Sequence, residues 1–383
     1  MLLKNAKVVD GSFETIAADL VVSGETIERI CAPGAANDET VYDLTGCTIL
    51  PGFIDMHIHG CAGADTGDAT PEALEAMSAL LAKEGITSFC PTTMTLPEEE
   101  IARILANVKA CMEKGLPGAY PQGVNMEGPF IAMSKKGAQN AAFLHAPDAQ
   151  MLHRLQQAAQ GLVKLVTLAP EEPGSLEFIK GARQDGITVS LGHTTADYDT
   201  ASAAYKAGAR QATHLFNAMP PFTHRAPGVV GAAFDYPEVK AELICDGVHI
   251  HPAVVRAVFR LFGSDRVILI SDSLRATGMP DGRYPFGGQE IEVHGNRATM
   301  ADDPNTLAGS VSDLMACLKS AVSFGIPLAD AVTAAAVNPA KVLGIYHRLG
   351  SLDIGKEANA AVLDEHLDLK AVLFHGEVVS GAL

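Results

Sequence analysis

One stretch decides the fold: Pro51-Gly52-Phe53-Ile54-Asp55-Met56-His57-Ile58-His59-Gly60. It ends an apolar run with two histidines spaced i, i+2, and a glycine stops it. Side chains two residues apart on a strand point to the same side. His57 and His59 should therefore face one place at the carboxyl end of a buried strand, where parallel α/β folds carry their chemistry. Taken alone, the pair could equally be two structural histidines.

From residue 51 onwards, short apolar runs alternate with amphipathic stretches. The runs predict eight strands, at 52–58, 86–90, 123–126, 163–168, 187–191, 211–213, 239–244 and 267–270. Amphipathic stretches such as 71–83, 98–114, 176–184 and 252–262 predict helices between them. Buried strands with helical crossovers predict an α/β fold with a (β/α)8 TIM-type barrel. The sixth crossover, 216–238, is rich in Pro and Gly and predicts mostly loop.

Both ends of the chain carry short runs rich in β-branched residues, at 6–9, 19–22, 26–30, 41–44, 360–363, 369–374 and 377–379. Turn pairs such as Asp10-Gly11 and Ser23-Gly24 separate the first of them. Neither terminal segment is long enough to bury a core alone. We therefore expect 1–50 and 345–383 to form one small β-sandwich domain, with the barrel at 51–344 inserted between them. Beyond the eighth strand, the sequence suggests a hairpin or small insertion at 281–300, then helices at about 310–323 and 328–343.

The composition limits the possible partners. A net charge of −17 argues against nucleic acid and anionic membranes, although one or two local cations can still hold a small phosphate. The seven cysteines are scattered and include no Cys-x-x-Cys, which suits a reducing compartment. No signal peptide opens the chain, and no apolar run reaches the roughly 18 residues of a membrane span. These features predict a soluble, cytoplasmic protein.

Polar residues follow most of the predicted strands. They are His57 and His59 after the first, Glu127 after the third, His193 after the fifth, His214 after the sixth, Asp246 and His249 after the seventh, and Asp272 after the eighth. In a barrel, all of these would line one rim. Imidazole and carboxylate groups that converge from different strands predict a site for a divalent transition metal such as Zn²⁺ or Fe²⁺.

Two acids in this set have distinct expected roles. Glu127 is expected to be an anionic metal ligand, with capping of the Gly128-Pro129 turn as the alternative. Asp272 could be a ligand or a free base. As a base beside a water activated by the metal, it would accept a proton and return it to the leaving group. This combination points to hydrolysis of an amide, an ester or a related C–N bond.

Longer motifs extend the pattern over nearly the whole chain. They are 51–60, Asn125-Met126-Glu127-Gly128-Pro129-Phe130 with Lys135-Lys136-Gly137, 191–195, Thr213-His214-Leu215-Phe216-Asn217-Ala218-Met219, 246–249, 271–278, 306–310 and 349–361. Together they resemble the amidohydrolase superfamily, and within it the family of N-acetylglucosamine-6-phosphate deacetylases. A lone His-x-His is weak evidence for the superfamily, whereas the motifs around Glu127 and His214 are far more specific.

The resemblance implies roles for individual residues. Glu127, His193 and His214 would hold the main metal, and Asp272 would be the general base and then the acid. His57 and His59 would hold a second metal or play structural roles, so one or two ions, Zn or Fe, are expected. The substrate-binding residues would be Ala138, Gln139, Asn217, Ala218, Asp246, Gly247, Val248, His249, Leu307, Ala308 and Gly309, with Arg225 reaching the phosphate from the neighbouring subunit of a homodimer.

One position departs from part of the family. Gln139 stands where some relatives have a histidine near the substrate carbonyl. Its amide can donate a hydrogen bond to a developing oxyanion but cannot carry a proton. Which group assists the metal at the carbonyl therefore stays open.

The activity implied is hydrolysis of N-acetyl-D-glucosamine 6-phosphate, a small amino-sugar phosphate, to D-glucosamine 6-phosphate and acetate in amino-sugar catabolism. The nearest alternative is the same reaction on the galactosamine epimer, which differs only at C4. A cyclic-amide hydrolase such as a dihydroorotase is more distant, since no lysine stands where Glu127 falls to become a carboxylated metal bridge. A sugar-phosphate sensor on an inactive barrel is the alternative outside enzymes, although no expected ligand is missing.

Overall fold

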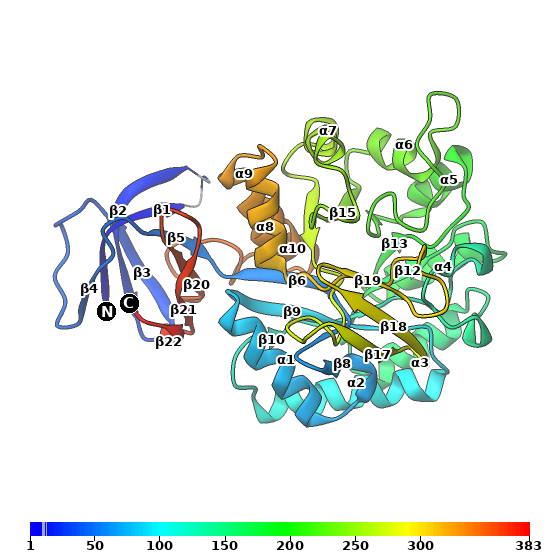
Figure 1. Cartoon of the computed structure of the whole chain (residues 1–383), viewed down its shortest axis with the longest axis horizontal. Helices are drawn as coiled ribbons and strands as arrows, with labels where there is room; N and C mark the ends of the chain where they lie inside the picture. Colours follow the sequence, from blue (N-terminus) through cyan, green and yellow to red (C-terminus); the bar gives the residue numbers. More distant parts are fainter. Residues whose placement is uncertain (10–11, 13) are drawn as a thin grey trace.

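The protein consists of a barrel of parallel strands beside a sheet built from both ends of the chain, as Figure 1 shows for the computed structural model. Residues 1–9, 12 and 14–383 are described. The arrangement confirms the expected fold class, a (β/α)8 barrel with a β domain formed by the termini. The turn predicted at Asp10-Gly11 lies outside the described residues.

The barrel contains eight parallel strands in sequence order. They are β6 (Phe53–Ile58), β9 (Ile86–Thr93), β11 (Val124–Met126), β12 (Val163–Leu168), β13 (Thr188–Leu191), β14 (Gln211–Ala212), β15 (Lys240–Ile244) and β16 (Val267–Ile270). β10 (Tyr120–Pro121) adds a short pairing to β9. All eight runs predicted as barrel strands are found, and the bounds of β12 and β16 coincide with the prediction.

The barrel closes between its last and first strands through main-chain hydrogen bonds just beyond β16. The Asp272 amide donates to the His57 carbonyl at 2.9 Å, and the His59 amide donates to the Ser273 carbonyl at 2.9 Å. Inside the wall, the Asp55 carboxylate accepts from the Ser271 amide at 3.3 Å. The closure therefore places both N-terminal histidines directly beside Asp272.

A helix follows each barrel strand. These helices are α1 (Pro71–Lys83), α2 (Glu98–Lys114), α3 (Ala149–Ala158), α4 (Ser175–Gln184), α5 (Tyr198–Ala207), α6 (Gly228–Asp235), α7 (Pro252–Phe262) and α8 (Leu314–Ser323). Side-chain caps fix several starts, because Asp148, Asp197 and Asp313 accept amide hydrogens from the first turns of α3, α5 and α8. Within the described ranges, no helix combines the length and apolar character that a bilayer crossing requires.

Two segments differ from the sequence-based expectation. The sixth crossover contains the helix α6, whose residues 228–233 are buried, although the surrounding Pro and Gly residues predicted mostly loop. The helix expected at 328–343 is divided into α9 (Leu328–Val332), a π-helical turn (Thr333–Val337) and α10 (Asn338–Val342). The insertion at 281–300 forms an antiparallel sheet of β17 (Gly282–Phe286), β18 (Gln289–His294) and β19 (Arg297–Met300).

The apolar residues of the first barrel strand enter two hydrophobic clusters. Phe53 and Ile58 of β6 pack in the large cluster that includes the surrounding helices. Ile54 and Met56 of the same strand join the smaller cluster that contains Ala340 of α10. Both faces of this strand are therefore buried, as is usual in a parallel sheet covered by helices.

The terminal sheet joins strands from the two ends of the chain in the order β22-β21-β20-β5-β1-β2-β3, with β4 paired to β1. Its strands are β1 (Leu2–Val9), β2 (Thr15–Ser23), β3 (Thr26–Cys31), β4 (Val41–Asp43), β5 (Thr48–Pro51), β20 (Ala360–Leu363), β21 (Leu369–Phe374) and β22 (Glu377–Gly381). A separate hydrophobic cluster, with Leu20, Ile49 and Val362 among its members, fills this part. We propose that this unit meets the barrel near residues 50–51 and 344–345.

Asn338, at the start of α10, offers a test of how α10 is held against the barrel. Its buried side-chain amide donates to the carbonyls of Ser264 and Val267, both at 2.7 Å. Replacing Asn338 with Ala removes both bonds, so we expect a loss of about 1–3 kcal/mol in stability and a lower midpoint of thermal unfolding. Asn107→Ala, which removes an exposed amide-to-carbonyl bond, is the matched control. Equal midpoints for the two variants would contradict this account.

Candidate active site

The predicted site residues lie at one end of the barrel, just beyond the strand ends. His193 and His214 each stand two residues after a strand, and so does Asp272. All three adopt left-handed backbone conformations, with φ values of 48°, 26° and 51°. Non-glycine residues seldom adopt such conformations. Their strands thus end in sharp turns from which the side chains enter a common pocket.

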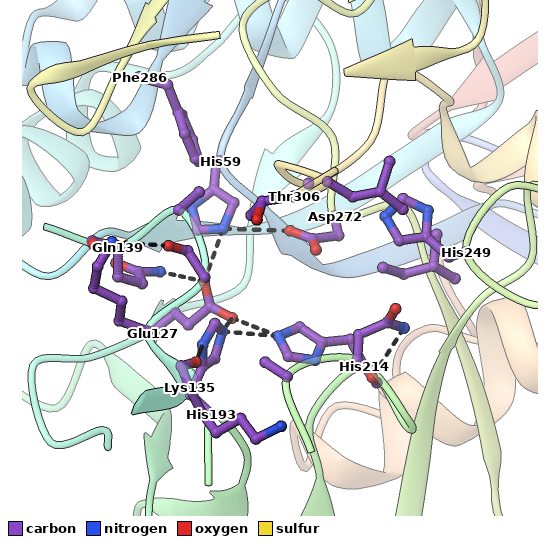
Figure 2. A pocket seen from close by; sticks show the side chains of 18 of the residues that line it. His59, Glu127, Lys135, Gln139, His193, His214, His249, Asp272, Phe286 and Thr306 are labelled. Carbon is purple, nitrogen blue, oxygen red and sulfur yellow. Dashed lines mark hydrogen bonds and ion pairs between the residues drawn. The ribbon is translucent and has the colours of Figure 1, made fainter. Parts of the chain in front are cut away.

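Glu127 stands at the centre of the cluster, as Figure 2 shows. Its Oε1 atom lies 3.1 Å from His193 Nε2 and 3.0 Å from His214 Nε2. Its Oε2 atom lies 3.1 Å from His59 Nε2, and Oε1 lies 3.4 Å from His57 Nε2. The structure therefore brings together all five residues predicted to be metal ligands.

These residues form two groups that could each hold a metal ion. One is Glu127, His193 and His214; the other is His57, His59 and Glu127. Within each group the ligand atoms all lie within 4.8 Å of one another, and every member is buried. Among the described residues, His57 Nε2 is a buried polar atom without a hydrogen-bond partner, although it faces carboxylate oxygens. Convergent imidazole nitrogens around a carboxylate suit a divalent transition metal, so the residues fit such an ion.

Asp272 borders the second group. Its Oδ1 atom lies 3.3 Å from His59 Nε2 and 3.6 Å from His57 Nε2. The side chain also lines the pocket described below. It therefore lies between the candidate metal ligands and the space in which a substrate could bind.

Buried carboxylates and imidazoles strongly shift one another's protonation. Burial alone would raise the pKa of Glu127, but the neighbouring His57 and His193 hold it well below its ordinary value. Burial also acts against the charged form of Asp272, and His57 and His59 outweigh it and lower that pKa. For His59, burial is opposed by bonds to Asp272 and Glu127, which raise the pKa to about 9. The negatively charged carboxylates of the cluster therefore strongly stabilise positive charge close to them.

Several neighbours orient the histidines. His193 Nδ1 lies 2.7 Å from the Lys135 carbonyl, and His57 Nδ1 lies 3.0 Å from Glu242 Oε2. Each contact leaves Nε2 directed towards Glu127.

Gly128 follows Glu127 with φ +86°, and a Cβ atom there would collide with Thr95. A larger residue at position 128 would therefore require Thr95 to shift.

The cluster forms the floor of a cavity of about 560 Å³. Seven of the residues predicted to bind substrate line it: Ala138, Gln139, Asn217, Ala218, His249, Leu307 and Gly309. Asp246 lies behind His249 and accepts from its main-chain amide at 2.9 Å, while Oδ2 lies 2.8 Å from Nδ1. Gly247, Val248 and Ala308 are not among the residues that line this cavity.

Gln139 has a fixed orientation at the cavity wall. Its Oε1 atom accepts from the Thr95 amide at 2.7 Å, and its Nε2 atom donates to Glu127 Oε2 at 2.7 Å. The main-chain donor determines which end of the amide faces the cluster. The contact seen here is therefore with a candidate metal ligand, whereas the sequence suggested a donor to the substrate.

Arg225 lies apart from this cavity. It is exposed and borders a separate hollow near Tyr198 and Pro220. Within one chain, it does not join the groups around Glu127.

Other residues at the site were absent from the predicted set. Lys135, Lys136, Phe286 and Thr306 line the cavity from loops and from the insertion, and Glu242 supports His57 from inside β15. The loop residues do not follow barrel strands, so strand-end reasoning could not find them. Glu242 did carry a signal, since it is an acidic residue flanked by Ala241 and Leu243 inside a mostly apolar predicted strand.

Known proteins are similar to this chain in both sequence and fold. The model of the amidohydrolase family matches residues 48–379. An N-acetylglucosamine-6-phosphate deacetylase from Bacillus subtilis (strain 168) is 41% identical over 334 residues, which cover 86% of this chain and 84% of that protein. An N-acetylgalactosamine-6-phosphate deacetylase from Escherichia coli O157:H7 is 35% identical over 333 residues, covering 87% and 88%.

Solved structures agree with the sequence comparisons. A mutant of N-acetyl-D-glucosamine-6-phosphate deacetylase from Mycobacterium smegmatis, in complex with N-acetyl-D-glucosamine-6-phosphate, superposes with a TM-score of 0.94 at 33% identity and covers 99% of each chain. A Xaa-Pro dipeptidase at 14% identity and a TM-score of 0.64 shares the fold alone. Because the family model spans most of the sequence and these relatives match over most of their length, the chain belongs to the amidohydrolase family.

Proposed function

We infer that the protein hydrolyses the acetamide of N-acetyl-D-glucosamine 6-phosphate, giving D-glucosamine 6-phosphate and acetate. The observation that carries this proposal is that Asp272 and the group of Glu127, His193 and His214 line one pocket. Relatives named for this activity match the chain over most of its length, and a solved relative holds this sugar phosphate. The natural role of such a reaction is amino-sugar catabolism.

A divalent metal, Zn or Fe, completes the proposed site. Glu127, His193 and His214 would hold the main ion, and His57 and His59 would hold a second ion together with Glu127. When bound, such an ion polarises the amide carbonyl and lowers the pKa of a water molecule. The donor set of imidazoles and carboxylates suits these metals better than Mg²⁺ or Ca²⁺, which favour oxygen ligands.

Asp272 is the proposed general base and acid. Its carboxylate takes a proton from the attacking water and delivers it to the amine nitrogen as the C–N bond breaks. Its carboxylate lies 3.3 Å from His59, next to the cluster, and it also borders the open cavity. His249, Asn217 and Ala218 also line the cavity and are proposed to contact the sugar.

We further propose that the phosphate is held by Arg225 of a second copy of the chain. Arg225 lies on the exposed segment 221–226, whose Phe222 borders an apolar hollow of about 610 Å³. The exposed side chains of Phe222, Phe234 and Leu261 line this hollow, and a partner subunit would cover them. His249 lines both this hollow and the candidate active site, so a partner seated here would bring its loop close to the substrate.

A cytoplasmic location is proposed from the cysteines. All seven are free, and five of them are buried. Unpaired thiols suit a reducing compartment.

Substitution of Asp272 tests its proposed role in proton transfer. Asp272→Asn should keep the fold and the bound metal but lower kcat by about 10²–10⁴-fold, because an amide cannot accept the proton. Acetate release, metal content and thermal unfolding should be measured on the same preparation. Near-normal turnover in this variant would remove Asp272 from the mechanism.

Chelation tests the metal and the substrate together. The purified protein should release acetate from N-acetyl-D-glucosamine 6-phosphate faster than from its galactosamine epimer, and chelation should abolish this activity until Zn²⁺ or Fe²⁺ is restored. Elemental analysis before and after treatment identifies the ion. A preference for the galactosamine epimer would transfer the proposal to that substrate, and full activity in a metal-free sample would contradict it.

Mixed dimers test whether Arg225 acts across a subunit interface. Arg225→Ala should raise KM for the phosphorylated sugar by about 10–100-fold, because a bidentate guanidinium contact is lost. Unfolding and refolding this variant together with Asp272→Asn should restore activity, since one site in each mixed dimer has both residues intact. Arg283→Ala, which removes an exposed arginine from β17, is the control. A mixture no more active than its components would show that Arg225 does not complete a partner's site.

A further inference from the structure

Glu242 is a buried carboxylate in the barrel wall that contacts both candidate metal groups. It lies in β15 and is 1% exposed. Its Oε2 atom lies 3.0 Å from His57 Nδ1 and accepts from the main-chain amide of His214 at 3.1 Å. The other oxygen, Oε1, accepts from Gln211 Nε2 at 2.5 Å. The carboxylate therefore joins a side chain of one group to the backbone of the other.

The contact with Glu242 determines what His57 presents to the cluster. A carboxylate accepts hydrogen bonds, so Nδ1 of His57 is the donor in this pair. Nε2 on the opposite side of the ring then faces Glu127 Oε1 at 3.4 Å and Asp272 Oδ1 at 3.6 Å. Among the described residues, Nε2 has no hydrogen-bond partner despite its burial. A buried nitrogen directed at two carboxylate oxygens is well placed to share a cation with them.

The main chain of Glu242 strengthens the link to the first group. Its carbonyl oxygen accepts from the Leu215 amide at 2.8 Å, one residue beyond the bond that its side chain makes to His214. The successive main-chain amides of His214 and Leu215 thus both donate to Glu242. Since His214 has a left-handed backbone, these bonds help to keep its unusual turn in place.

We propose that Glu242 is a positioning residue that controls occupancy of the second metal position, formed by His57, His59 and Glu127. It does so by fixing the tautomer and orientation of His57. The inference rests on the proposed function in one respect: it takes the cluster to be a metal centre.

Two substitutions separate the shape of this residue from its charge. In Glu242→Gln, the oxygen near His57 and His214 can be kept, and the new amide nitrogen can face Gln211. Gln211 Oε1 has no hydrogen-bond partner among the described residues, so that side chain can turn and accept from it. Glu242→Ala removes both the acceptor and the charge, which frees the His57 ring.

The experiment measures Zn²⁺ bound per chain by elemental analysis and the affinity for each equivalent by competition with a chromophoric chelator. Wild type should bind two equivalents. Glu242→Ala should keep the first and weaken the second by about 10–100-fold, and Glu242→Gln should weaken the second less. In a His57→Ala background, adding Glu242→Ala should cause no further loss. Thermal unfolding in chelator monitors the fold, and Glu242→Gln decides the test if the Ala variant does not fold.

Asp19→Asn is the matched control. Asp19 is 1% exposed and accepts from the main-chain amides of Asn5 and Gly34, at 2.9 and 2.8 Å, in the terminal sheet. This variant also neutralises a buried carboxylate that binds amides, but far from the cluster, and it should bind both equivalents with wild-type affinity.

Three results would overturn the proposal. They are wild-type affinity for both equivalents in the two Glu242 variants, an equal effect of Glu242→Ala when His57 is absent, and a single equivalent in wild type that His57→Ala does not change. Acetate release by the wild-type protein in any of these cases would leave the proposed function standing. Loss of the second equivalent in Glu242→Ala, in a protein without deacetylase activity, would support the role of Glu242 and reject the substrate.

Discussion

The Glu127 carboxylate is the constraint on which the arrangement of the barrel mouth depends. It is 3% exposed, and its two oxygens face imidazoles that follow β6, β13 and β14. A buried carboxylate is expensive unless positive charge or hydrogen-bond donors surround it. Three separate strand ends must therefore stay in register around one anion. The closing bonds between residues 57–59 and 272–273 satisfy this requirement on the first strand, since they join it to the last.

The same requirement accounts for the local backbone strain. His193, His214 and Asp272 have positive φ, a conformation that is unfavourable for residues with a Cβ atom. The surrounding contacts hold these turns, as when the amide of His214 donates to Glu242. The strands end at the rim of the barrel, and the strained residues that follow them direct their side chains into the cavity. As a result, imidazoles and carboxylates that follow regularly spaced strands come together in one compact cluster.

Much of this arrangement follows from the sequence. The apolar runs that form β12 and β16 and the amphipathic helices α1, α2 and α7 have periodicities that burial requires, so their bounds could be predicted. The residues directly after the strands could also be assigned to one rim, because parallel strands end at the same edge. The five candidate ligands and Asp272 all stand at or just after such strand ends.

The remaining features depend on contacts between distant segments. The left-handed turns at His193 and His214 are set by neighbouring strands, and ordinary residues there give no local signal. Phe286 reaches the cavity from β17 and lies 5.6 Å from His59 between ring centroids, which only the packing of the insertion determines. The α6 helix was obscured because Pro220, Pro221 and Pro227 precede a short apolar segment. Gln139 had the expected location, but the Thr95 amide decides its partner.

The terminal sheet has a consequence for how the protein is made. Residues 48–51 of β5 pair with β20, so strand neighbours are separated by some 300 positions along the chain. A ribosome releases the amino end first, which leaves β5 without this partner while the whole barrel is being translated. Only Gly52 separates β5 from β6. The segment that leads into β6 therefore has β1 as an early neighbour, and it gains its second neighbour in the sheet only after residues 360–363 have been translated.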